Sequence, residues 1–287
     1  MTSGPINATI FGKKASPLRH FPRLQLSLRR KYLRDRAFAE NLGDGMVLCR
    51  MLGQYKIFAD PSDWSVSPHI IADGIWEARV TEVVIDTLKK GMTAIDVGAN
   101  LGYYSMIMAD RCGATGRVMA IEPNPAMVRR IEATCILNGV SDRVTVHPFP
   151  VAERDGRPAT LVIPINHPGG AQLTGASVAN STSIECSTRR LDGIPGALEA
   201  SFVKIDAEGF EEAIWQGMRK MVEGAHLRTM VVEFAPSVYA DAGGFVDEIT
   251  KAGFAIHDID HKAGAVPIGR DALLNGTESM RMLLLKR

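Results

Sequence analysis

Residues 93–105 decide the fold class; they read Thr-Ala-Ile-Asp-Val-Gly-Ala-Asn-Leu-Gly-Tyr-Tyr-Ser. The apolar run Thr93–Val97 predicts a short buried strand, and the residues that follow predict a tight turn into a helix. Gly98, Ala99 and Gly102 let the backbone approach a ligand closely, and free amides at a helix start favour a negative group. The spacing differs from the dinucleotide fingerprint G-x-G-x-x-G, because the middle glycine that approaches a pyrophosphate is missing.

Strand and helix patterns alternate outward from this stretch. The further strands are expected at 118–122, 144–147, 201–206, 227–234, 254–258 and 281–286. The helices are expected at 76–90, 103–111, 125–138, 211–222 and 245–252. Such alternation is typical of an α/β fold with a doubly wound parallel sheet.

The chain divides into two parts on composition. Residues 1–56 are expected to form a basic helical N-terminal extension, with one helix from Leu18 to about Met51, and 55–67 is rich in turn residues. Residues 57–287 are expected to form one α/β domain. Gly, Ser, Thr, Asn and Pro are frequent at about 153–188, which predicts a β-rich insertion near the functional end of the sheet.

The formal net charge of +1 hides a strongly basic first segment. Between Gly12 and Arg36 the chain has nine basic residues and one acidic residue, Asp35. We favour a solvated face whose apolar side packs on the sheet or on a second copy in a homo-oligomer. Contact with an anionic membrane surface and binding of a phosphorylated or carrier-tethered acceptor stay open. The near-neutral total gives no reason to expect a nucleic-acid partner.

Cysteine usage and hydropathy predict a cytoplasmic protein. The four cysteines have neither C-x-x-C nor zinc-ligand spacing and are expected to be reduced thiols: Cys49, Cys112, Cys135 and Cys186. No apolar run reaches the ~18 residues that a membrane span needs.

Two carboxylates at strand ends predict a nucleoside-like ligand. Glu122 ends the second strand, twenty residues after Gly102, where a carboxylate can accept both hydroxyls of a ribose. Asp96 lies two residues before Gly98, where it suits an amino or sulfonium group better than a pyrophosphate.

The chain resembles class I S-adenosylmethionine-dependent methyltransferases, and more narrowly the FkbM family. The resemblance spans about Ile57 to Phe254 and is carried by the segments 74–77 with Thr81, 91–105, 121–124, 203–209 with Glu211, and 231–233. It implies a seven-stranded Rossmann-like sheet of order 3-2-1-4-5-7-6 with the last strand antiparallel.

The resemblance also implies cofactor contacts. The methionine part of S-adenosylmethionine would contact Asp96, Gly98, Asn100 and Gly102, and the ribose would contact Glu122 in the motif that ends at Asn124. Val151 and Ala152 would lie near the adenine. Glu77, in the preceding helix, would close over the cofactor.

Acidic residues follow the fourth and fifth strands. Alternation places Lys204 and Asp206 on one side of their strand, with Glu208 just beyond and Glu233 on the neighbouring strand. Crowded carboxylates raise at least one pKa and suit a general base; we favour this over a divalent-cation site made of Asp206, Glu208 and Glu233. His167 is the best histidine candidate for a base, ahead of His147, His257 and His261.

We therefore expect an S-adenosylmethionine-dependent methyltransferase, and the resemblance implies O-methylation of a hydroxyl on a small-molecule acceptor, a sugar or a secondary metabolite. Two alternatives are a nicotinamide-dinucleotide oxidoreductase and a catalytically silent methyltransferase-like domain that binds partners.

Overall fold

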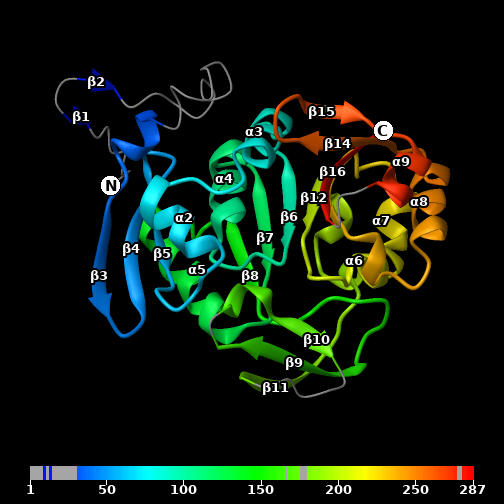
Figure 1. Ribbon diagram of the computed structural model, residues 1–287, viewed down its shortest axis with the longest axis horizontal. Helices are drawn as coiled ribbons and strands as arrows, with labels where there is room; N and C mark the ends of the chain where they lie inside the picture. The colour runs from blue at the N-terminus through cyan, green and yellow to red at the C-terminus, as the bar shows by residue number, and fades with distance from the viewer. Residues whose placement is uncertain (1–8, 11–12, 15–30, 166, 175–179, 277–279) are drawn as a thin grey trace.

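A mixed sheet forms the centre of the computed structural model, which describes residues 9–10, 13–14, 31–165, 167–174, 180–276 and 280–287. Its strands are β6 (Thr93–Val97), β7 (Arg117–Ile121), β8 (Val144–His147), β12 (Phe202–Ile205), β13 (Thr229–Phe234), β14 (Ala255–Asp260), β15 (Gly264–Pro267) and β16 (Arg281–Lys286). They are ordered β15-β14-β16-β13-β12-β6-β7-β8 (Figure 1). Strand β16 is antiparallel to both neighbours, whereas β8, β7, β6, β12 and β13 are parallel.

The α/β class and the large mixed sheet are confirmed, and seven of the eight strands follow the order expected from the resemblance. The expected strand number is wrong by one. Asp260 Oδ1 accepts hydrogen bonds from the N–H groups of Lys262 and Ala263, and this turn returns the chain as edge strand β15.

Helices cover both faces of the sheet (Figure 1). Strand residues such as Ala94 and Phe202 pack in one apolar cluster with α3 (Ala78–Thr87), α4 (Tyr103–Cys112) and α5 (Pro125–Asn138). Their sequence neighbours Ile95 and Val203 pack in a second cluster with α6 (Glu211–Gln216), α7 (Arg219–Glu223), α8 (Ala242–Lys251) and α9 (Arg270–Asn275). The two clusters follow from the two-residue alternation of each strand.

The helix expected at 211–222 is broken into α6 and α7. A side chain at Gly217 would overlap the carbonyl oxygen of Ala152, so the backbone at Gly217 packs directly against the chain that follows β8. Glycine is also a poor helix former, so the break falls at a residue that favours it on both grounds.

The expectation that the N-terminal helix continues to about Met51 is wrong. Residues 31–34 are helical, but β3 (Ala39–Gly43), β4 (Met46–Met51) and β5 (Tyr55–Ala59) form an antiparallel sheet, followed by α2 (Val66–Asp73). Alternate residues of β4 are buried, which fixes it as a strand. The buried Arg130 joins this sheet to α5 through an ion pair of 2.7 Å with Asp60 and a 2.8 Å hydrogen bond to the Gly45 carbonyl.

Most of the basic segment lies outside the described residues, apart from residues 31–36 and the short hairpin β1 (Thr9–Ile10) and β2 (Lys13–Lys14). Its three interpretations stay predictions. Within the described part of the chain, no helix is both long and apolar enough to cross a bilayer.

The insertion forms a separate antiparallel sheet of order β10-β9-β11, with β9 (Pro158–Pro164), β10 (Gln172–Thr174) and β11 (Ser181–Ser187). Single helical turns lie at η2 (Pro168–Gly170), η3 (Leu191–Gly193), η4 (Ala197–Glu199) and η5 (Pro236–Val238). Turn η2 links β9 to β10 and lies at the cavity described next.

Candidate active site

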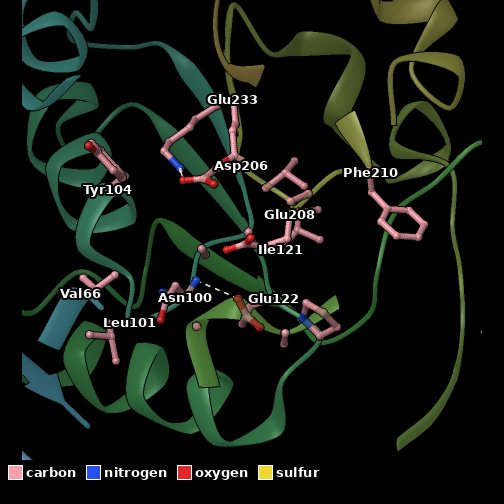
Figure 2. Close-up of a pocket in the computed structure, with 18 of the residues that line it drawn as sticks. Val66, Asn100, Leu101, Tyr104, Ile121, Glu122, Asp206, Glu208, Phe210 and Glu233 are labelled. Carbon is pink, nitrogen blue, oxygen red and sulfur yellow. Dashed lines mark hydrogen bonds and ion pairs between the residues drawn. The ribbon is translucent and has the colours of Figure 1, made fainter. Parts of the chain in front are cut away.

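A cavity of about 360 Å³ lies at the carboxyl ends of the parallel strands. Its walls come from the ends of β6, β7, β12 and β13, from α2, from the start of α4, from the insertion and from β16. Figure 2 shows Asn100 and Glu122 at one end of a group of polar side chains, Asp206 and Glu233 at the other, and Glu208 between them. The cavity therefore has two chemically different ends.

The turn after β6 has a backbone that other residues would strain. Gly98 has φ +73°, and a side chain there would overlap the Asp206 carbonyl oxygen from the neighbouring strand end. Asn100 has φ +50°, a left-handed conformation that asparagine tolerates better than most residues. The Oδ1 atom of Asn100 is buried and has no hydrogen-bond partner. It is an acceptor available to a ligand in the cavity.

Glu122 fixes this turn to the start of α5. Its Oε2 accepts the Asn100 N–H and its Oε1 accepts the Asn124 N–H, each at 2.8 Å. Burial raises the pKa of Glu122 to about 7, against the opposing effect of these two hydrogen bonds. Each carboxylate oxygen keeps a second acceptor site, so both can still bind hydroxyl groups.

Lys204 lies at the centre of the acidic end. Its Nζ donates to Asp206 Oδ2 at 2.8 Å and lies 4.7 Å from the centre of the Tyr104 ring. Strand register places Lys204 beside Asp96 on β6. Although burial opposes the charge, the surrounding carboxylates of Asp206, Asp96 and Glu77 raise the pKa of Lys204. The residue is a buried ammonium ion that compensates several acids.

Glu77 reaches the same group from the turn before α3. It has φ +39° and accepts a 2.8 Å hydrogen bond from the Tyr104 hydroxyl. Burial and the nearby Asp206 raise the pKa of Glu77.

The loop after β12 and the end of β13 supply two further acids. Burial, followed by the Asp206 charge, raises the pKa of Glu208. The same causes, in the same order, raise the pKa of Glu233 to about 9. Crowding thus adds to burial, the larger cause, in raising the pKa of both acids.

The expected catalytic residues Lys204, Asp206, Glu208 and Glu233 all line the cavity. So do the expected cofactor residues Glu77, Gly98, Ala99, Asn100, Glu122 and Val151.

Four other expected cofactor residues do not line the cavity. Gly102 caps α4 with φ +82°, and a side chain there would press on Ile131. The Asn124 side chain caps α5 by accepting the Ala126 N–H and donates to the Pro168 carbonyl. Ala152 packs against Gly217. In this structure these three residues have structural roles: Gly102 and Asn124 cap helices, and Ala152 packs against a neighbouring segment.

Asp96, the fourth, lies just beneath the cavity. It is fully buried, and its Oδ2 accepts a 2.6 Å hydrogen bond from the Ser105 hydroxyl. Its Oδ1 has no partner. Burial raises the pKa of Asp96, with Lys204 opposing.

Among the histidines, His167 lines the cavity and His147, His257 and His261 do not. The His167 Nδ1 lies 3.6 Å from Asp63 Oδ1.

The divalent-cation alternative has no support in the part of the chain that the structure describes. There, no group of three or more His, Cys, Asp and Glu side chains is arranged to hold a metal ion. Asp206 is directed to Lys204 instead.

The profile of the methyltransferase FkbM domain matches residues 96–257, more than half of the chain. The chain belongs to the FkbM methyltransferase family. This FkbM protein is therefore an S-adenosylmethionine-dependent methyltransferase by family. Comparison with curated proteins gave no significant match.

Solved structures of methyltransferases are similar to this FkbM protein at low identity. An FkbM methyltransferase from Methylobacillus flagellatus KT shares 15% identity over 69% of this chain and 44% of that one, with a TM-score of 0.43. A methyltransferase from Geobacter sulfurreducens shares 15% identity over 74% of this chain and 80% of that one, with a TM-score of 0.41. An S-adenosylmethionine-dependent O-methyltransferase from Thermotoga maritima shares 13% identity over 88% of this chain and 86% of that one, with a TM-score of 0.44. Sequence identities and TM-scores this low carry no conclusion about the reaction.

Sequence reasoning missed three residues that shape the site of this FkbM protein. Tyr104 supports both Glu77 and Lys204. Glu211 accepts the Ala207 N–H at 2.8 Å and the Tyr239 hydroxyl at 3.0 Å, which fixes the loop that carries Glu208. The Glu211 signal was present in the 203–211 motif, whereas the Tyr239 contact spans 28 residues and has no local signal.

Proposed function

We propose that the cavity binds S-adenosylmethionine and that the protein transfers its methyl group to a hydroxyl oxygen of a small-molecule acceptor. One observation supports this most: the unpaired acceptor Asn100 Oδ1, beside the Glu122 carboxylate, and the carboxyl cluster around Asp206 occupy opposite ends of the same cavity. The first end suits the cofactor, and the second end suits a nucleophile that must lose a proton.

The residues present fit the cofactor. Its ammonium group needs acceptors, and Asn100 Oδ1 is a buried acceptor without a partner in the cavity lining. Asp96 Oδ1 also has no partner, but Asp96 does not itself line the cavity. Its ribose diol needs a carboxylate at the end of the second strand, where Glu122 lies. A cavity of about 360 Å³ lies within the usual range for small-molecule sites. Val151 lies at the wall that we assign to the adenine.

The bound cofactor supplies a methyl group that its sulfonium already activates. The chain has then to orient the acceptor oxygen and take its proton. We assign the proton transfer to Asp206, whose carboxylate lies in the cavity and is held by Lys204 at 2.8 Å. Glu233, with a pKa near 9, carries a proton at neutral pH and can donate a hydrogen bond to the acceptor. Glu208 is the second candidate base.

The family assignment decides against the nicotinamide alternative. A catalytically silent domain stays as the competing hypothesis, because a family can contain members that bind without reacting.

The test measures methyl transfer from labelled S-adenosylmethionine to a panel of alcohols and phenols. We expect Asp206→Asn to lose about 10²-fold or more of the turnover while its affinity for S-adenosylhomocysteine stays unchanged. The control is Asp142→Asn, which removes an exposed carboxylate on the surface. Unchanged turnover in Asp206→Asn would remove Asp206 from the mechanism, and no transfer by the wild type to any acceptor would favour the silent domain.

A further inference from the structure

Apolar side chains surround the carboxyl end of the cavity. Met282 is the cross-strand partner of Glu233, and both residues line the cavity. Trp76 precedes Glu77 and also lines it. Figure 2 shows Phe210 at the level of Glu208, whereas Val66 lies near Leu101 and Asn100, at the other end. The acids are thus polar groups set into an apolar wall.

The apolar surface continues to exposed side chains next to the cavity. Met280 lines it and is 55% exposed. Trp64 is 70% exposed and its ring centre lies 6.3 Å from that of the lining residue His167. Val238 is 58% exposed and lies against Gly209, the residue after Glu208. Large exposed apolar side chains that gather at a cavity indicate a surface that an apolar ligand covers.

The charge inside the cavity is strongly one-sided. Its lining includes the acids Glu77, Glu122, Asp206, Glu208 and Glu233. Among the described lining residues, Lys204 is the single lysine or arginine, and it is 1% exposed and paired with Asp206. An anionic acceptor would meet no unpaired lysine or arginine among these described residues, and its charge would further disfavour ionisation of the neighbouring acids.

We infer that the acceptor is an uncharged alcohol or phenol with an apolar body, which places one hydroxyl at Asp206 and its aromatic or alkyl part against Trp76, Phe210 and Met282. This inference rests on the proposed function and narrows it. A free sugar carries hydroxyls all around its ring, and an apolar wall would leave several of them without partners, which costs binding free energy. A phosphorylated acceptor would need an unpaired lysine or arginine, which the described residues of this wall do not supply.

Binding to the S-adenosylhomocysteine complex tests the inference with three probes: 2-naphthol, 2-naphthyl phosphate and D-glucose. Calorimetry should give 2-naphthol an affinity at least ~10-fold above that of the phosphate ester, a difference of about 1.4 kcal/mol, and no binding of glucose. Equal or tighter binding of the phosphate ester, binding of glucose in preference to 2-naphthol, or no binding of 2-naphthol would overturn the inference.

A charge-introducing variant separates the wall from non-specific adsorption. Met282→Lys should weaken the binding of 2-naphthol and strengthen the binding of 2-naphthyl phosphate, whereas Met282→Leu, the matched apolar control, should keep the wild-type preference. An unchanged preference in Met282→Lys, with intact S-adenosylhomocysteine binding, would show that the probes do not contact this wall and would overturn the inference.

These experiments distinguish failure of the proposed function from failure of the inference about the acceptor. No S-adenosylhomocysteine binding by the wild type contradicts the proposed function and the inference together. Normal S-adenosylhomocysteine binding with the opposite probe ranking contradicts the acceptor class alone.

Discussion

Lys204 Nζ lies 2.8 Å from Asp206 Oδ2, and the lysine is 1% exposed. The same ammonium group offsets the charge of Asp96 beside it and of Glu77. Because a buried ion pair owes much of its stability to mutual compensation, loss of either partner leaves the other charge costly to bury. Lys204 therefore positions the acids of the cavity as well as stabilising the fold.

Lys204→Met tests this compensation. We expect it to lower the free energy of unfolding by about 3 kcal/mol at pH 7, because it leaves several buried carboxyl groups without a cation. The double variant Lys204→Met/Asp206→Asn should recover part of that loss. Urea unfolding of both variants measures it, and additive losses in the double variant would contradict the proposed coupling.

Gly98→Ala tests the close approach of the cofactor turn to Asp206. Left-handed backbone strain and the overlap with the Asp206 carbonyl predict that the free energy of unfolding falls by roughly 2–4 kcal/mol. The matched control is Gly139→Ala: Gly139 has φ +64°, but a Cβ atom there would meet nothing within 4 Å, so we expect about 1 kcal/mol from strain alone. If Gly98→Ala and Gly139→Ala lower the free energy of unfolding equally, in thermal or urea unfolding, the overlap at Gly98 has no energetic cost.

Glu233 predicts a pH dependence of stability. Its pKa rises from the ordinary 4.5 to about 9 on folding, so between these values the folded protein holds a proton that the unfolded chain has released. The contribution of Glu233 to the free energy of unfolding is fully present below pH 4.5 and is lost as the pH rises towards 9.

Glu233→Gln should remove that dependence. Over pH 5 to 9, its unfolding free energy should fall less steeply than that of the wild type, by up to about 1.4 kcal/mol per pH unit. Glu199→Gln, at an exposed glutamate, is the control and should follow the wild type. Parallel curves for wild type and Glu233→Gln would contradict the raised pKa.

Strong local patterns made the central fold predictable. Pro125 and Gly139 bracket α5, which the structure places at Pro125–Asn138 as expected. The strand order of the seven core strands came from the family resemblance and not from the local pattern. Strand β15 was missed because four residues after a turn give little periodic signal.

The N-terminal sheet shows where periodicity was misread. Val47, Cys49 and Met51 are buried at every second position, which is the strand period. The helical spacing of the apolar residues before them, from Leu18 to Tyr32, favoured one long helix instead. The sheet also depends on the long-range pair Arg130–Asp60, which no local pattern indicates.

The site shows a similar division. The same-side placement of Lys204 and Asp206 followed from strand alternation and is confirmed by their ion pair. The roles of Asn124 and Ala152 could not be separated from ligand contact by sequence, because helix capping and backbone packing depend on segments distant in the chain.

Calorimetric titration of the purified protein with S-adenosylhomocysteine and, separately, with NAD⁺ tests the central claim most directly. The account predicts saturable binding of S-adenosylhomocysteine that Asn100→Ala weakens, and no binding of NAD⁺. Binding of NAD⁺ without binding of S-adenosylhomocysteine would contradict it.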